Sequence, residues 1–169
     1  MRTFIRARTA TAAAVSGLLI TSVTTNVQAL TPDGHHGHGP TKQEIRALFG
    51  EWNEALATGD PERVADRYAP EAVLEPTLSN LIRHDHAGIV DYFEHFLLQH
   101  PSGEINESYV ELLGQDGAVD SGGYTFHLTD PETGVPYDVV ARYTFVYERD
   151  KHTGEWLIVD HHSSAMPEG

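Results

Sequence analysis

The chain of 169 residues has no cysteine, so no disulfide can stabilise it. It also has few basic side chains: 11 Lys and Arg stand against 25 Asp and Glu, a formal charge of −14 with histidine neutral. A surface of this sign repels the phosphates of nucleic acids and of anionic membranes. We therefore expect neither as a partner, and we expect stability to come from a hydrophobic core and from oligomerisation.

The chain has no apolar run of membrane-spanning length. Three arginines are the only charged residues among the first 29, and a short run of small and apolar residues follows them at 10–23. That run is too short and too rich in Thr and Ser to span a bilayer stably. Because Val27-Gln28-Ala29 supplies the small residues of a cleavage site, we predict a signal peptide at 1–29 and export to the periplasm or the medium. Cleavage would leave 8 basic and 25 acidic side chains, a charge of −17.

Residues 30–40 are rich in Gly, Pro and His, and we interpret them as a flexible leader. His35, His36 and His38 could capture a divalent metal ion, but a solvated tail is the simpler interpretation. We place the folded domain at 41–169.

The first helix is predicted to begin at Thr41, because Thr41 and Glu44 have the spacing of a capping box. Apolar residues follow at helical spacing: Ile45, Leu48, Phe49, Trp52 and Leu56. Gly59 is expected to end this helix.

Asp60 and Pro61 then have the types preferred at the start of a second, shorter helix, whose buried side we expect to hold Val64 and Tyr68. A short strand is predicted at 72–75. A third helix is predicted over 87–99, with its inward residues being Ile89, Phe93, Phe96 and Leu97.

The pattern changes to period two after Pro101. Strands are predicted at 105–113, 117–128, 137–148 and 155–165, separated by turns rich in Gly and Asp. Helices followed by an antiparallel meander predict an α+β fold, in which a curved sheet wraps over a helical layer and forms a cone with a pocket at its mouth.

The last strand carries the candidate chemistry. Strict alternation sends Asp160, His162 and Ser164 to the same face as the apolar Trp156 and Ile158. A face that begins apolar and ends polar indicates that its end lines a polar cavity.

In the strand at 137–148 two inward rows are possible. We favour Val139, Ala141, Tyr143 and Phe145 over the more polar alternative row.

Four segments resemble the association domain of calcium/calmodulin-dependent kinase and its bacterial relatives, within the nuclear-transport-factor-2-like cone fold. They are residues 75–80, 91–93, 141–145 and 160–168. The His-His-Ser-Ser segment also resembles the signature of the iota-class carbonic anhydrases, which is usually written with three histidines. Asp160 stands in place of the first of them.

The resemblance implies a homodimer that hydrates CO2 to bicarbonate in a pocket inside the cone. It implies that Thr77, Tyr92 and Ser164 bind substrate and take part in catalysis. We also predict that Asn80 and Arg83 bind substrate. His162 would be the base, because histidine changes charge near neutral pH. Some members of the class are described as working without metal and others are associated with zinc or manganese, and we expect no required cofactor.

Two other functions stay open. One is a non-enzymatic oligomerisation or small-ligand-binding domain, with the outward face of the meander as its interface. The other is an isomerase, cyclase or oxidoreductase-like enzyme that uses Asp160 and His162 as a pair, since the fold hosts many chemistries. A larger hydrophobic pocket would favour the isomerase, cyclase or oxidoreductase-like enzyme, whereas a very small pocket would favour hydration of CO2.

A metal site is the less favoured interpretation of the histidines. His161 and His162 are adjacent on a strand and point in opposite directions, and a third ligand would have to come from His84, His86 or His127. We therefore predict no metal ligands. His162 as a core histidine and Tyr92 as an ordinary core residue are the plain alternatives to their functional roles.

Overall fold

The computed structural model describes residues 39–167. The predicted signal peptide, and the leader up to residue 38 with its three histidines, lie outside the described residues and stay predictions. Within 39–167, no helix is long and apolar enough to cross a membrane.

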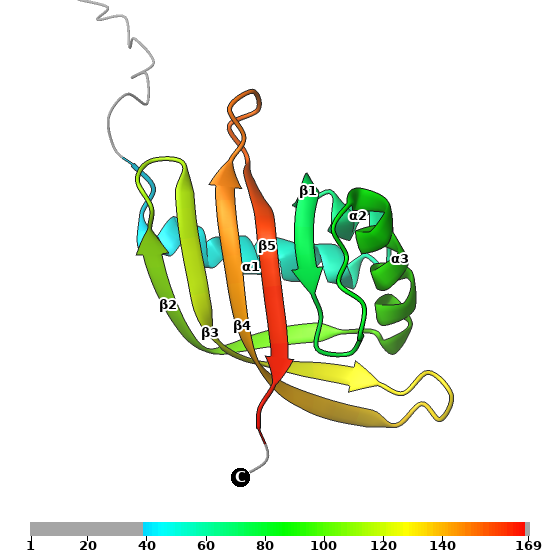
Figure 1. Ribbon diagram of the computed structural model, residues 1–169. Coiled ribbons are helices and arrows are strands. Elements are labelled where there is room, and N and C mark those ends of the chain that lie inside the picture. The colour runs from blue at the N-terminus through cyan, green and yellow to red at the C-terminus, as the bar shows by residue number, and fades with distance from the viewer. Residues whose placement is uncertain (1–38, 168–169) are drawn as a thin grey trace, which may run out of the picture. The chain divides into compact units, whose positions relative to one another are not determined.

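The described chain forms a helical layer on one face of a five-stranded sheet (Figure 1). The elements in chain order are α1 Lys42–Ala57, α2 Pro61–Ala65, β1 Tyr68–Glu75, α3 His86–Phe96, a short 3-10 helix η1 Leu97–Gln99, β2 Ser102–Leu112, β3 Gly117–Thr129, β4 Pro136–Arg149 and β5 Trp156–Ala165. The sheet order is β1-β5-β4-β3-β2. Strands β2 to β5 form the predicted antiparallel meander, and β1 adds to its edge parallel to β5. The predicted α+β architecture is confirmed.

Helix α1 begins and packs as its sequence predicts. Glu44 accepts a hydrogen bond from the backbone N–H of Thr41 at 2.6 Å, and the Thr41 hydroxyl accepts one from the N–H of Glu44 at 3.2 Å. All five residues of the apolar stripe are buried. The helix ends at Ala57, and Gly59 follows with a φ of +69°, a conformation that costs glycine little.

The start of β1 differs from the prediction. Asp60 caps α2 as expected, but Tyr68 is the first residue of β1 rather than part of a helix. The strand begins four residues before the predicted Ala72 because Tyr68 pairs in parallel with Ile158, at the far end of the chain. Helix α3, which was predicted to extend to residue 99, ends at Phe96, and Leu97–Gln99 form the 3-10 helix η1. Local sequence does not encode a long-range pairing of this kind.

An extra residue in β5 reverses the alternation predicted for this strand. Ile158 pairs with Tyr147 of β4 and Asp160 pairs with Val146, which leaves Val159 as a bulge between the two pairs. Before the bulge Ile158 is buried, as predicted, and after it the buried residues are His161 and Ser163. The prediction that His162 and Ser164 face inward is therefore wrong.

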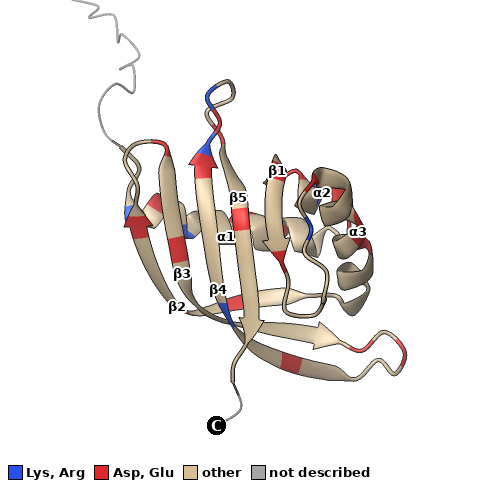
Figure 2. Ribbon diagram, viewed as in Figure 1, with Lys and Arg blue, Asp and Glu red and all other residues tan. Residues whose placement is uncertain are grey.

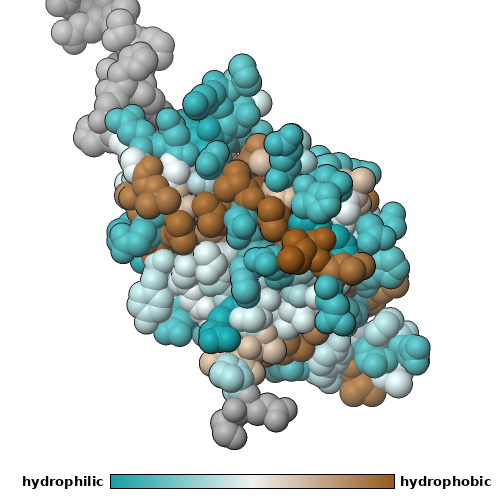
Figure 3. Space-filling view, in the orientation of Figure 1, coloured by the Kyte–Doolittle hydropathy of each residue, from teal (hydrophilic) through white to brown (hydrophobic). Residues whose placement is uncertain are grey.

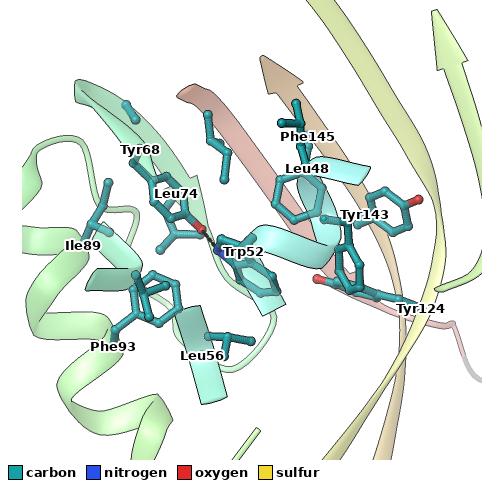
Figure 4. Close-up of a cluster of buried hydrophobic side chains, with 14 of the residues drawn as sticks. Leu48, Trp52, Leu56, Tyr68, Leu74, Ile89, Phe93, Tyr124, Tyr143 and Phe145 are labelled. Carbon is teal, nitrogen blue, oxygen red and sulfur yellow. Dashed lines mark hydrogen bonds between the residues drawn. The ribbon is translucent and has the colours of Figure 1, made fainter. Parts of the chain in front are cut away.

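The inner face of the sheet forms the core against α1 and α3. The favoured row of β4 is confirmed, with Ala141, Tyr143 and Phe145 buried. Trp52 of α1 lies in the aromatic cluster (Figure 4), in ring contact with Phe93 of α3, Phe126 of β3, Phe145 of β4 and His161 of β5.

We call the opposite face, which no helix or strand within residues 39–167 covers, the outer face (Figure 1). The cross-strand row at its centre consists of Tyr109, Ser121, Thr144, His162 and Glu75. The next row consists of Glu111, Val119, Val146, Asp160 and Val73. The central strand β4 carries no charged residue from 143 to 147 (Figure 2), and a hydrophobic band crosses this side of the molecule (Figure 3).

Candidate functional site

A small cavity lies between α1, α3 and the inner face of the sheet. The space open to the centre of a water molecule inside it is about 20 Å³, which is room for one or two waters. Its walls are mostly apolar and include Leu74, Phe93, Phe96 and Phe126. Six side chains with hydrogen-bonding groups join them: Trp52, Thr77, Tyr92, Tyr124, His161 and Ser163. Among residues 39–167, no Asp, Glu, Lys or Arg lines this cavity.

Three hydroxyl groups form a hydrogen-bonded chain at the cavity. The Tyr124 hydroxyl donates to Ser163 Oγ at 2.5 Å, and Ser163 Oγ is also hydrogen-bonded to Thr77 Oγ1. Burial raises the pKa of Tyr124, so its phenol stays protonated and can donate at any physiological pH. Thr77 comes from the loop after β1 and Ser163 from the adjacent strand β5, so the parallel pairing of these strands brings the two together.

His161 lies deeper and takes part in a second chain. The Trp52 indole N–H donates to Tyr68 Oη at 3.0 Å, and Tyr68 Oη lies 2.9 Å from His161 Nδ1. The imidazole stacks on Phe145 with ring centres 4.0 Å apart. Burial, aided by the nearby His162, lowers the pKa of His161 to about 3, so the ring is neutral near pH 7.

The structure places Thr77 and Tyr92 at the cavity, as the resemblance implied. The ring of Tyr92 stacks on Phe96 at 5.5 Å, and the Arg83 guanidinium lies 5.8 Å from its ring centre. Burial raises the pKa of Tyr92, so it is a neutral phenol.

His162 and Ser164 do not line the cavity. Both lie on the outer face, where His162 Nδ1 is 3.4 Å from Glu75 Oε2 on the neighbouring strand β1. Asp160 is on the same outer face, where partial burial and the nearby Glu75 raise its pKa. The geometry therefore does not bring the Asp160–His162 pair of the isomerase hypothesis to the cavity.

Asn80 and Arg83 do not line the cavity either. Asn80 is exposed, and Arg83 lines a separate surface hollow behind Tyr92. The Arg83 side chain donates to Ser79 Oγ at 3.1 Å and to Asp91 Oδ2 at 3.2 Å, so it holds the loop after β1 against α3.

Sequence reasoning missed Tyr124, His161 and Ser163 as cavity residues. Tyr124 lies in a strand whose polar and apolar residues alternate regularly, so its sequence context is that of an ordinary core residue. His161 and Ser163 belong to the motif that was singled out, but the bulge at Val159 exchanged their face with that of their neighbours. A Ser-Ser pair at the end of a strand does signal that one of its serines faces inward.

Of the histidines considered as metal ligands, His161 lines the cavity, whereas His84, His86, His127 and His162 do not. His86 is paired with Glu62 at 3.0 Å, and His127 with Asp138 at 2.8 Å. In the part of the chain from 39 to 167, no group of three or more His, Asp or Glu is arranged to hold a metal ion.

The inward position of Ser163 predicts different effects for two adjacent substitutions. Ser163→Ala removes the acceptor of the buried Tyr124 hydroxyl, and an unsatisfied buried donor costs roughly 1–3 kcal/mol of unfolding free energy. Ser164→Ala removes an outer-face hydroxyl and should change stability by less than about 0.5 kcal/mol. Urea unfolding of both variants measures the difference. A larger loss for Ser164→Ala would contradict the observed register.

The helix-first order, the curved five-stranded sheet and the cavity between them define the nuclear-transport-factor-2-like fold. A superfamily member from Salmonella enterica superposes with a TM-score of 0.64 at 17% identity, covering 75% of this chain and 91% of that one.

The family is narrower than the fold. The sequence model of the family named calcium/calmodulin dependent protein kinase II association domain matches residues 41–167, and the chain belongs to this family. A crystal structure from Xanthomonas campestris assigned to the same association domain is 54% identical, with a TM-score of 0.73, and covers 79% of this chain and 95% of that one. The CaMKII hub homology domain of Chlamydomonas reinhardtii is 22% identical, with a TM-score of 0.58 and coverage of 74% and 97%. A search of curated proteins gives no significant match.

Proposed function

We propose that the protein is a self-associating domain, a homodimer joined through its outer face, which holds one small molecule in the cavity. The observation that carries the proposal is the composition of the outer face. An antiparallel sheet with one face in solvent normally places polar and charged residues on it. Here the centre is Ser121, Thr144, Val119 and Val146, all half-buried by their neighbours alone, with Tyr109 66% exposed beside them.

The charge of the chain makes a second copy the best-supported occupant of the centre of this face. Two copies that each carry a strong negative charge repel one another unless they meet where charge is low. On the outer face, Glu75 and Glu111 lie on the two edge strands β1 and β2, and Asp160 lies on β5 beside the central strand β4. A two-fold contact centred on β3 and β4 would bury apolar and hydroxyl side chains, and a stable one buries about 800 Å² on each copy. The name of the family, an association domain, supports the same interpretation.

A charge at the centre of the outer face should break this contact. Thr144→Glu places a carboxylate in the middle of the central row, where a dimer would desolvate it against its own copy. Gln115→Glu adds the same charge in the exposed turn between β2 and β3 and is the matched control. Light scattering of the chain without its predicted signal peptide should give twice the monomer mass for the unmodified protein and the control, and the monomer mass for Thr144→Glu. A monomeric unmodified protein at micromolar concentration would overturn the proposal.

Ligand binding is better supported than catalysis by the chemistry of the cavity walls. A general base works best with a pKa near the working pH. The tyrosines lining the cavity have raised pKa values and His161 has a strongly lowered one, so neither takes up and releases protons near pH 7. His162, predicted as the base, is on the other side of the sheet.

Hydration of CO2 is the second candidate. Two observations favour it: the cavity is very small and apolar, and Thr77, Ser163 and Tyr124 could together position a water molecule in it. Stopped-flow CO2 hydration, before and after exhaustive chelation, tests this candidate. Activity that survives chelation and falls in Ser163→Ala but not in Ser164→Ala would support it. Activity restored by zinc or manganese would direct attention to the histidines, and no activity would leave the binding function.

A further inference from the structure

One buried polar atom at the cavity, Nε2 of His161, has no hydrogen-bond partner among residues 39–167. His161 itself is 3% exposed. A buried nitrogen in this state costs free energy unless something satisfies it. Since His161 is one of the residues that line the cavity, an occupant of the cavity is the available partner.

The neighbours of His161 determine which of its two nitrogens carries the hydrogen. The indole nitrogen of Trp52 can only donate, so Tyr68 Oη accepts from it at 3.0 Å. The hydroxyl hydrogen of Tyr68 then needs an acceptor of its own, and His161 Nδ1 is 2.9 Å away. If Nδ1 carried the hydrogen instead, the buried Tyr68 hydroxyl would be left without an acceptor. A neutral imidazole that accepts at Nδ1 has its hydrogen on Nε2.

The geometry points to His161 as a hydrogen-bond donor, through Nε2–H, to the molecule held in the cavity, with Trp52 and Tyr68 as the residues that position this hydrogen. The inference rests on the proposed binding function of the cavity. It also defines the class of ligand. A donor from His161 requires an acceptor atom, and an oxygen is the common one. Within the described residues 39–167, no charged side chain lines the cavity to compensate an anion, and burying an uncompensated charge is costly. The ligand is therefore a small neutral molecule with an oxygen acceptor.

Nitrogen NMR of histidine-labelled protein tests the inference. The chain has 11 histidines, and the signal of His161 is assigned by its absence in His161→Phe. If that variant does not fold, the signal is assigned by proximity to the Phe145 ring, 4.0 Å away. We expect Nε2 protonated and Nδ1 unprotonated throughout pH 6 to 8. A hydrogen on Nδ1 would overturn the inference.

Dissolved CO2 is the ligand probe, used at constant pH with dinitrogen at equal pressure as the control. In uniformly nitrogen-labelled protein, we expect CO2 to shift the signals of His161 Nε2 and of the Thr77 backbone, and dinitrogen to leave Nε2 unchanged. If CO2 shifts Thr77 and Ser163 but not Nε2, the cavity binds the probe and the role of His161 is wrong. If no cavity signal responds, the binding function of the cavity fails, and the inference fails with it.

Tyr68→Phe tests the positioning role separately. Without the Tyr68 hydroxyl, Nδ1 loses its donor, so we expect a mixture of the two hydrogen positions and a smaller CO2 shift at Nε2. Tyr137→Phe removes a surface tyrosine hydroxyl and should change neither readout. An unchanged hydrogen position in a folded Tyr68→Phe would show that Trp52 and Tyr68 do not set it.

Discussion

Replacing Gly122 with alanine should destabilise the protein severely, whereas the same change at Gly123 should be tolerated. A Cβ on Gly122 would lie 1.9 Å from the carbonyl oxygen of Glu107 and 2.8 Å from its carbonyl carbon. These are backbone atoms of the paired strand β2, so relief requires the strands to separate. We expect a loss of about 3 kcal/mol or more, which lowers the melting temperature by roughly 10 °C.

Gly123→Ala is the matched control, because its Cβ would come no closer than 3.7 Å to Glu107, an ordinary contact. Its effect should stay within about 0.5–1 kcal/mol, partly through the less flexible unfolded chain. Thermal unfolding followed by circular dichroism measures both variants. Equal melting temperatures would show that β2 and β3 are not paired as described.

Truncation of Trp52 should have the largest effect among the core residues. The side chain is 1% exposed, and it makes edge-on contacts with Phe93, Phe126 and Phe145 at 5.6–6.3 Å between ring centres. Trp52→Ala leaves a cavity at this junction and removes the donor to Tyr68, at a cost of about 3–5 kcal/mol. Such a loss is a large part of the roughly 5–15 kcal/mol of a typical domain.

Leu98→Ala provides the comparison, since Leu98 is 59% exposed and its truncation removes little buried surface. Guanidinium unfolding should show a much lower midpoint for Trp52→Ala and a nearly unchanged one for Leu98→Ala. Similar midpoints for the two variants would contradict the central position of Trp52.

Much of the fold was predictable because its signals are local. The capping box of Thr41 and Glu44 and the apolar stripe of α1 involve residues within a few positions of one another. The period-two pattern of β2 to β5 predicted four strands within a few residues of their observed bounds. Thr77 and Tyr92 were found from the family motif, and both line the cavity.

The orientation of the site residues was not predictable in this way. A single bulge at Val159 exchanged the inward residues of β5, so Ser163 and His161 line the cavity where Ser164 and His162 had been expected. The residue types around Val159 do not predict the bulge. It is defined by the pairing of β5 with β4 on one side and with β1 on the other, and both partners are distant in sequence.

The sequence by itself determined the helices, the strands, their order and the family, because capping, amphipathic periodicity and turn residues act over a few positions of the chain. Only the tertiary structure decided which of two adjacent serines, histidines or glycines faces the interior. That choice depends on strand register, and a shift of one residue moves every later side chain to the other face of the sheet.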